Sequence, residues 1–507
     1  HHHALPLLVR VLVQLTCLTG TYATTHPAPP STASSVQDAV DKAAASGDTV
    51  SLGSGTHDIS KGVVIVSKNI EVKCSSPSSG ASSSAPACVL DCKEADVTGL
   101  HITGAAARIS IVDVRIERCH KRGVYLETGT LLCSGSAQIS NNYHTSAGGG
   151  IYAEKGAAIY LSGNAQISDN TATTQAGGIY MLGGTITMSG ASRVARNTAT
   201  TSHGGGIYMY PIGVHKLALT MSDSASVLNN SAPMECCGGV YLRGTRFQST
   251  MSESDFGAVV MRDRAAIAFN SARYSGGAML SAGASMEMHG LSSIHSNLAT
   301  TEHTGGLYLV GESEQPGTEH IVSTLTMKDD ASIQRNAAAA SSYGGLYLAK
   351  GARAHMSNRA HISHNIAMHY AGGLLITSST TFETKCSLTM TDHTKIFNNT
   401  ASSHTGGFGI FKGSDFVARD YARISHNVAT LDHTGGLYIS GMNAEAHFYN
   451  HASLENNSCT LGHSGGAYVG GGAQLNFHDD ARVQYNSAAT NAGGVYASAF
   501  DKLTTTP

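Results

Sequence analysis

Four aspartates in neighbouring repeats are the closest approach in the chain to a catalytic set of carboxylates. Asp223 and Asp263 occupy equivalent places in two successive repeats, and Asp392 and Asp420 do so in another two. Clustered carboxylates can bind Ca²⁺ or act as acid and base on polysaccharides. Glycine or asparagine stands at the same place in other repeats, which is typical of a turn. A turn explains these aspartates without catalysis, and Ca²⁺ would be a cofactor only if they serve an enzyme.

Three histidines in consecutive repeats form a second set of candidate ligands. His404, His433 and His463 each stand three residues before the second glycine of a Gly-Gly pair. Stacked imidazoles could bind a divalent transition metal, or become charged together below about pH 6.5. Asp432 alone adds a carboxylate at a suitable spacing, so the pattern favours a polar turn over a metal site. We expect no other cofactor.

Both sets of residues belong to twelve repeats of about 28 residues that share an asparagine. An apolar residue stands three positions before each asparagine, and Gly, Asp or Asn stands seven positions before it. The amide of asparagine can donate a hydrogen bond to one neighbouring repeat and accept one from the other. We therefore interpret this column as a structural ladder rather than a sugar-binding site. Its members are Asn142, Asn170, Asn197, Asn230, Asn270, Asn297, Asn336, Asn365, Asn399, Asn427, Asn457 and Asn486.

Each repeat carries three strand-like segments, such as "TITMSG", "SRVARN" and "GGIYM". Three short strands in a repeat of this length predict one rung of an all-β parallel β-helix. Residues 135–500 would form twelve rungs, and residues 35–134 a short capping helix and the first rungs, about 15 rungs in all. In the helix, Ser35 and Asp38 would form a capping box and Gly47 would end it.

Further columns predict which residues turn the chain and which fill the interior. The Gly, Asp or Asn seven positions before each ladder asparagine indicates a left-handed backbone. Methionines two residues earlier recur in seven successive repeats and indicate interior filling. The Gly-Gly pair allows close backbone approach, and the tyrosine that usually follows would pack its ring with the hydroxyl at the rim. Exposed stacked tyrosines could also bind carbohydrate.

The ends of the chain and its cysteines indicate export. Residues 1–23 contain an apolar segment followed by small residues and predict an N-terminally incomplete signal peptide, with a retained signal anchor as the alternative. Residues 24–34 would be a linker, and residues 501–507 a tail or truncation point. Membrane association would require that anchor or a missing C-terminal part. Cys74 and Cys88 flank a loop that a disulfide could close.

Composition and local motifs restrict the partners. Charged residues make up 13% of the 507 residues and the formal net charge is −3, which argues against nucleic acid. Sequons begin at Asn229, Asn398 and Asn456, which are glycosylation candidates in a eukaryotic secretory host. Insertions interrupt the repeats at roughly residues 209–219, 242–259, 309–324 and 376–388, where we expect any partner site.

Two stretches carry a resemblance to known families. The "GGIY", "GGLY" and Ile-x-x-Asn phrases resemble the repeats of chlamydial polymorphic outer membrane proteins, with Ile, Val or Leu where that family has Phe. The stretch "SVQDAVDKAAASGDTVSLGSGTH" looks like the start of pectin-lyase-like right-handed β-helix proteins. This resemblance implies a right-handed β-helix and an adhesin or surface passenger domain.

We therefore expect a secreted or surface-displayed extracellular scaffold with an adhesive or structural role. Its partner would be a carbohydrate or a cell-surface molecule. The alternative is a carbohydrate-active enzyme, either a lyase, a hydrolase or an epimerase, that acts on an extracellular polysaccharide.

Overall fold

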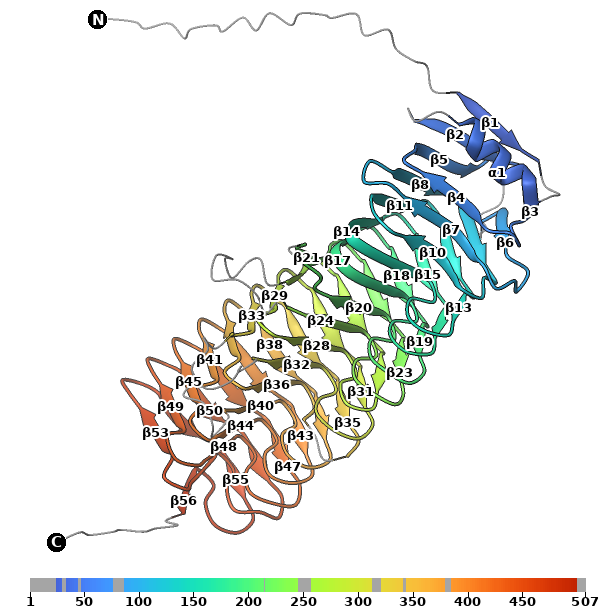
Figure 1. The fold of residues 1–507 in the computed structure, drawn as a ribbon. Helices are drawn as coiled ribbons and strands as arrows, with labels where there is room; N and C mark the ends of the chain where they lie inside the picture. Colours follow the sequence, from blue (N-terminus) through green and yellow to red (C-terminus); the bar gives the residue numbers. More distant parts are fainter. Residues whose placement is uncertain are drawn as a thin grey trace, which may run out of the picture.

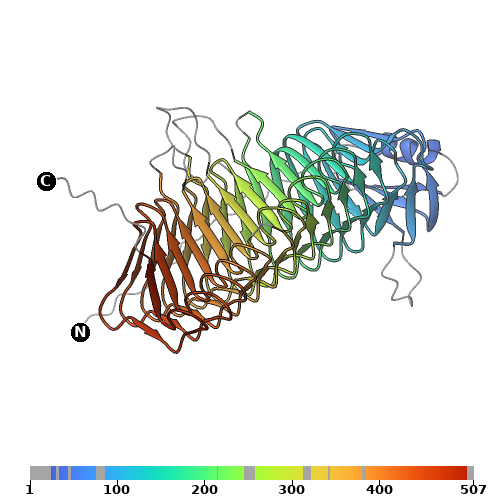
Figure 2. The same cartoon turned by 90° about the horizontal axis from the view of Figure 1, so that it is seen from below.

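The computed structural model describes residues 24–29, 33–43, 47–75, 86–213, 215–244, 257–311, 321–340, 343–378 and 384–498. These residues form one rod, in which the chain winds in successive rungs from a small cap at the N-terminal end (Figure 1). Figure 2 shows the same rungs stacked along the whole length of the rod. Like strands of successive rungs pair in parallel. The fold is a right-handed parallel β-helix, as predicted.

The sheet whose strands precede the ladder asparagines has 15 strands, one for each rung, and this confirms the expected number of rungs. Its strands follow each other in chain order. They are β3 (Gly55–Asp58), β6 (Cys88–Asp91), β9 (Val114–Glu117), β12 (Gln138–Ser140), β15 (Gln166–Ser168), β18 (Arg193–Ala195), β22 (Ser226–Leu228), β26 (Ala266–Ala268), β30 (Ser293–His295), β34 (Ser332–Gln334), β38 (His361–Ser363), β42 (Lys395–Phe397), β46 (Arg423–Ser425), β50 (Ser453–Glu455) and β54 (Arg482–Gln484).

The other strands of each repeat are distributed over two further sheets, and this distribution differs from the one that the sequence predicted. The Gly-Gly segment and the methionine segment share one 29-stranded sheet, for example as β20 (Ile207–Tyr210) and β21 (Leu217–Met221). In two rungs they fuse into single long strands, β14 (Ile151–Leu161) and β17 (Ile179–Met188). The third sheet has 12 strands of two residues, from β13 (Tyr143–His144) to β55 (Ser487–Ala488). These strands follow each ladder asparagine and are too short to give a periodic signal.

Register places like residues above each other and buries the apolar columns. Met188 pairs with Met221, and Ile167 pairs with Val194. The seven methionines are fully buried, which confirms their interior role. They are Met188, Met221, Met261, Met288, Met327, Met356 and Met390. Where Ala418 takes the next place, the rings of Phe408 and Phe416 meet at 4.8 Å between centroids and fill the space.

Two backbone requirements explain fixed residue types in the repeat. A Cβ on Gly306 would lie 2.2 Å from the carbonyl oxygen of Gly345 in the next rung, so the Gly-Gly pair does permit close approach. The Gly, Asp or Asn seven positions before each ladder asparagine has positive φ in all twelve repeats, from 57° to 66°, which confirms the predicted left-handed turn.

A second left-handed column was not predicted. The residue immediately before each ladder asparagine also has φ between 52° and 58°. These residues include Phe269, Arg335 and Tyr485, which share no preference for this conformation. The turn at this point of the rung imposes the conformation, whatever the residue type.

The N-terminal cap corrects two expectations. Residues 24–34 are not only a linker, because β1 (Thr25–Ala28) pairs in parallel with β2 (Asp48–Leu52) and extends the 29-stranded sheet. Helix α1 (Ala33–Lys42) begins before Ser35, which therefore lies inside the helix and not at its N-cap, so the predicted capping box is wrong. The apolar face is as expected, since Val36, Ala39, Val40 and Ala43 are all buried.

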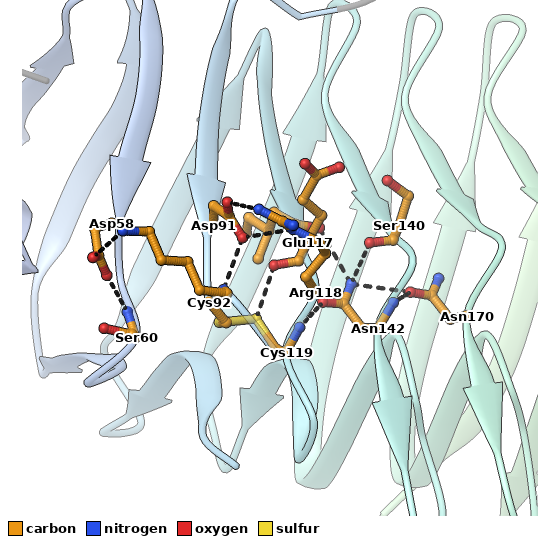
Figure 3. The surroundings of a disulfide bond; sticks show 12 residues. Asp58, Ser60, Asp91, Cys92, Glu117, Arg118, Cys119, Ser140, Asn142 and Asn170 are labelled. Carbon is orange, nitrogen blue, oxygen red and sulfur yellow. Dashed lines mark hydrogen bonds and ion pairs between the residues drawn. A yellow bond between two sulfur atoms is a disulfide. The ribbon is translucent and has the colours of Figure 1, made fainter. Parts of the chain in front are cut away.

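Two disulfides join the first rungs. Cys74 at the end of β5 (Asn69–Cys74) bonds Cys88 at the start of β6, as predicted. Cys92 bonds Cys119, a pairing that the sequence did not indicate (Figure 3). The described residues also include five free cysteines, namely Cys133, Cys236, Cys237, Cys386 and Cys459.

Some expectations fall outside the described residues. The signal peptide at residues 1–23 and the tail at residues 501–507 lie there, as do parts of the four insertions, including residues 245–256 and 312–320. Within the described ranges, no helix has the length and apolar character that crossing a membrane requires.

Candidate functional site

The asparagine column is a continuous hydrogen-bonded ladder. The Nδ2 of each asparagine donates to the Oδ1 of the next, for example from Asn270 to Asn297 at 3.0 Å. The same Oδ1 accepts the backbone N–H of Asn270 at 2.9 Å, and Asn297 Nδ2 also donates to the carbonyl of Ile267 in the preceding rung at 3.0 Å. All twelve asparagines take part, and those from Asn142 to Asn457 are at most 1% exposed. A buried amide with its bonds satisfied within the protein is a structural element, as predicted.

The four candidate catalytic aspartates form a turn ladder at the surface, where Asp223 and Asp263 are exposed and Asp392 and Asp420 are partly exposed. Asp223 donates its backbone N–H to Asp263 Oδ2 at 3.0 Å, and Asp392 donates to Asp420 Oδ2 at 3.3 Å. Asn358 supplies the same kind of bond to Asp392 at 2.9 Å. Each carboxylate therefore holds the turn of the preceding rung. These hydrogen bonds to the backbone explain why aspartate stands at these positions. The catalytic interpretation gains no support from them.

The three candidate metal ligands stack without converging on one point. The rings of His404 and His433 are stacked with centroids 4.8 Å apart, and His433 meets His463 edge to face at 6.0 Å. Burial lowers the pKa of His404 and of His433, so these two rings resist charging. Asp432 lies 2.9 Å from His433 Nδ1 and 3.8 Å from His463 Nε2. Across the part of the chain that the structure describes, no three His, Cys, Asp or Glu side chains are arranged to hold a metal ion.

The tyrosine column packs ring on ring. Tyr180 lies 5.0 Å from Tyr152 and 5.2 Å from Tyr208, centroid to centroid, and Tyr208 lies 4.8 Å from Tyr241. Each inner ring thus has both faces covered by its neighbours. These tyrosines stabilise the corner, and their faces are not available for stacking on a sugar ring.

A shallow groove follows the outer face of the 15-stranded sheet from β38 to β54. Three adjacent hollows form it, the largest with a volume of about 460 Å³. Parallel register aligns two columns of residues along it, of which Ser363, Ser425, Ser453 and Glu455 are buried. One reads His361, Lys395, Arg423, Ser453 and Arg482, and the other reads Ser363, Phe397, Ser425, Glu455 and Gln484. We call this surface the β38–β54 groove.

The β38–β54 groove has more cations than anions. Its lining includes four arginine or lysine residues and two carboxylates. Arg359 forms a two-bond pair with Asp330, and Arg423 lies 3.3 Å from Glu455. Gln484 donates to the second oxygen of Glu455 at 2.9 Å. The two remaining cations, Lys395 and Arg482, make no ion pair with any described residue.

Aromatic rings and imidazoles alternate beside these cations. Tyr421, at 45% exposure, is stacked between His393 and His451, each with its ring centroid 5.1 Å away. Phe397 contacts His361 and His364 at 5.6 and 5.5 Å. Burial lowers the pKa of His361, which therefore favours its neutral form. Aromatic edges with adjacent unpaired cations can bind a ligand that combines apolar parts with negative charge.

The sequon asparagines also lie on the outer surface. Asn229, Asn398 and Asn456 belong to the second left-handed column and are exposed. Asn398 lines one of the hollows, where its Nδ2 is 3.3 Å from His364 Nε2. Glycosylation at these asparagines stays a prediction.

Sequence reasoning missed the β38–β54 groove because it searched for repeated residues. The groove instead depends on residues that differ from rung to rung, on either side of the buried apolar residue of each strand. Alternation predicts that these two positions face outward. A search for cations and aromatic rings at those positions in successive repeats would have found Lys395, Phe397, Arg423 and Arg482.

Comparison with known proteins supports the fold. Residues 98–256 match the family model described as "Right handed beta helix region". No curated protein and no solved structure gave a significant match to the chain. The strands described within the matched range belong to the same continuous stack as the later rungs. The chain therefore has the right-handed parallel β-helix fold over the residues that the structure describes.

Proposed function

We propose that this protein is an exported β-helix scaffold that binds an acidic polysaccharide along the β38–β54 groove, in an adhesive role. The observation that carries the proposal is the pair of unpaired cations, Lys395 and Arg482, on either side of the stacked ring of Tyr421. Arginine and lysine bind carboxylate and sulfate groups. Imidazoles cover both faces of Tyr421, which is nevertheless 45% exposed, so its uncovered edge would contact the sugar.

The spacing of the groove suits a linear polymer. Strands of successive rungs lie about 4.8 Å apart, so the cations of β42, β46 and β54 form a row along the rod. A row of charges on a rigid sheet meets a chain of repeated acidic units with little loss of side-chain freedom. The rigid scaffold thus favours a polymer over a small ligand.

The carboxylates of the groove favour binding over catalysis. Both oxygens of Asp330 accept hydrogen bonds from Arg359, and both oxygens of Glu455 face donors from Arg423 and Gln484. A general acid or base must reach the substrate with an oxygen that is free to exchange a proton. Neither carboxylate is presented in that way.

Export is part of the proposal and rests on two features. Disulfides are typical of oxidising compartments, and the described rungs contain two. The apolar segment within residues 1–23 has the composition of a secretory signal.

Binding to immobilised polygalacturonate and alginate tests the proposal, with neutral dextran as the reference polymer. We expect the double variant Lys395→Gln/Arg482→Gln to bind at least tenfold more weakly than the unchanged protein, with a smaller dependence on salt. The matched control is Arg264→Gln/Arg353→Gln, which removes the same charge from exposed residues outside the groove. Equal affinity of the two double variants, or equal binding of dextran, would contradict the proposal. Shortened polymer chains after incubation would point to the enzymatic alternative.

A further inference from the structure

Two adjacent cysteines occupy the turn between β23 (Ser231–Ala232) and β24 (Val240–Arg243). Cys237 is fully buried and has positive φ of 65°, in a position where Gly204 stands in the preceding rung. Cys236 is only partly buried. The pair packs against a cluster of Tyr208 and Tyr241. Cys237 is therefore held in the interior, whereas Cys236 keeps part of its surface exposed.

His203 from the preceding rung is fixed beside Cys236. The backbone N–H of Cys236 donates to His203 Nδ1 at 3.3 Å. The imidazole is stacked on Tyr241, with ring centroids 5.4 Å apart and planes 13° from parallel. The stacking holds the ring in place, so its contact with Cys236 does not depend on a mobile side chain.

The side chains that surround Cys236 favour its thiolate form. The neighbouring Cys237 and His203 side chains lower the pKa of Cys236 below that of an ordinary thiol, and this effect outweighs the opposing effect of burial. The same contact raises the pKa of His203, whereas burial raises the pKa of Cys237. Thiolate character with partial exposure is the combination that makes a cysteine nucleophilic.

The other groups that face Cys236 do not cancel this effect. Glu235 opposes the thiolate by charge repulsion, and Tyr241 and Tyr308 face it as neutral phenols whose pKa values are raised by burial. The remaining free thiols are unlike Cys236. Burial raises the pKa of Cys133 to about 12, that of Cys386 to about 11, and that of Cys459 as well.

We propose that Cys236 is a site of covalent modification that undergoes thiol–disulfide exchange with low-molecular-weight disulfides. The Cys236 thiolate attacks one sulfur of a disulfide RS–SR, a new Cys236–SR bond forms, the RS–SR bond breaks, and the second half leaves as the thiolate RS⁻. Cys237 acts as the hydrogen-bond donor that stabilises the attacking sulfur. His203 positions and stabilises the same sulfur and is not itself modified.

Reaction of the folded full chain with the aromatic disulfide 5,5′-dithiobis(2-nitrobenzoate) tests this inference, since release of the coloured thiolate counts reactive thiols. We expect one fast equivalent per chain, about tenfold faster at pH 6 than an unperturbed exposed thiol. Cys236→Ser should abolish this fast equivalent. The matched control Cys133→Ser should retain it, and peptide mapping should place the adduct on Cys236.

His203→Asn separates the proposed role from simple exposure. This variant should move the midpoint of the rate-against-pH curve upward by about one unit and leave the rate at pH 9 unchanged. A fast equivalent that survives Cys236→Ser would overturn the inference. So would an unchanged pH profile in His203→Asn, or a thiol that reacts only after reduction of a disulfide between Cys236 and Cys237. None of these results bears on polysaccharide binding, which the groove variants test separately.

Discussion

The first rungs and the repeated rungs solve the same packing problem by different chemistry. Ile116 pairs with Ile139, so Cys119 occupies the place that Asn142 takes one rung later. From Asn142 onward, side-chain amides connect the rungs, whereas Cys119 is bonded to Cys92. The two systems meet where the backbone N–H of Cys119 donates to Asn142 Oδ1 at 3.1 Å (Figure 3).

This comparison shows what the asparagine ladder and the disulfide each require from neighbouring rungs. A ladder asparagine needs a partner in both neighbouring rungs, because an unpaired buried amide costs about 1–3 kcal/mol. A disulfide satisfies both of its members within one bond. It can therefore stand at the edge of the ladder, next to rungs that lack asparagine. Ion pairs from Lys93 to Asp58 and from Arg118 to Asp91 also connect these first rungs.

Interruption of the ladder should have the largest effect on stability. Asn297→Ala removes the acceptor of the Asn270 amide and backbone N–H, and leaves the Ile267 carbonyl without its donor. We expect a loss of about 4 kcal/mol in the free energy of unfolding, measured by chemical denaturation. Asn164→Ala, at an exposed asparagine outside the ladder, should change it by less than about 0.5 kcal/mol. Equal losses would show that the ladder does not stabilise the rod.

Removal of the Cys92–Cys119 disulfide should have the next largest effect. The double variant Cys92→Ala/Cys119→Ala opens a loop with a separation of 27 residues and should lose about 3 kcal/mol. Hydrogen exchange should locate the loss in the first rungs. Cys92→Ala/Cys119→Asn should recover about 1 kcal/mol of it, because a new amide at position 119 lies next to Asn142 Oδ1. No recovery would mean that amide and disulfide are not interchangeable at this position.

The second left-handed column is common to both regions, since Arg118 has φ of 55° and Arg335 has the same value. Arg335→Gly should stabilise the rod by about 0.5–1 kcal/mol, because glycine adopts this conformation without steric cost. The adjacent Gln334→Gly, in strand β34, should destabilise it by about 1 kcal/mol. Thermal unfolding of the two variants measures this difference in stability. Melting temperatures that shift in the same direction would contradict the explanation by backbone conformation.

The smallest effect concerns the ion pairs of the first rungs. The hydrogen bond from Lys93 lowers the pKa of Asp58 to about 2. A lowered pKa means that the pair adds stability above the ordinary aspartate pKa, near 4, and that this contribution is lost as the pH falls from about 4 to about 2. The pair is partly exposed, so we expect no more than about 0.5 kcal/mol. In Lys93→Met, the pKa of Asp58 measured by NMR should rise towards its usual value; an unchanged pKa would assign the shift to Ser60 alone.

Repetition decides how much of this molecule could be predicted from sequence. The ladder, the methionine column and the first left-handed turn recur at fixed spacing, and stacking turns such recurrence directly into contact. The strand β1, with Pro27 inside it, and the Cys92–Cys119 bond each occur once and depend on pairing across many residues. No local pattern marks them.

The β38–β54 groove and the Cys236 turn escaped prediction for a related reason. Lys395, Phe397 and Arg482 face outward, where the fold accepts almost any residue, so their types carry no structural signal. The proximity of His203 and Cys236 arises from stacking of two turns that are 33 residues apart in the chain. Only the register, known from the structure, shows that they meet.

Because all bonds of the amide ladder run in one direction, duplication or deletion of a whole repeat can change the length of the rod. Each asparagine contacts only the rung before it and the rung after it, through bonds of the same geometry. Deletion of residues 271–297 would place Asn270 directly next to Asn336, so that its Nδ2 could donate to Asn336 Oδ1 as that of Asn297 does now. A gene that gains or loses such a unit therefore changes the reach of the rod while every remaining junction is preserved.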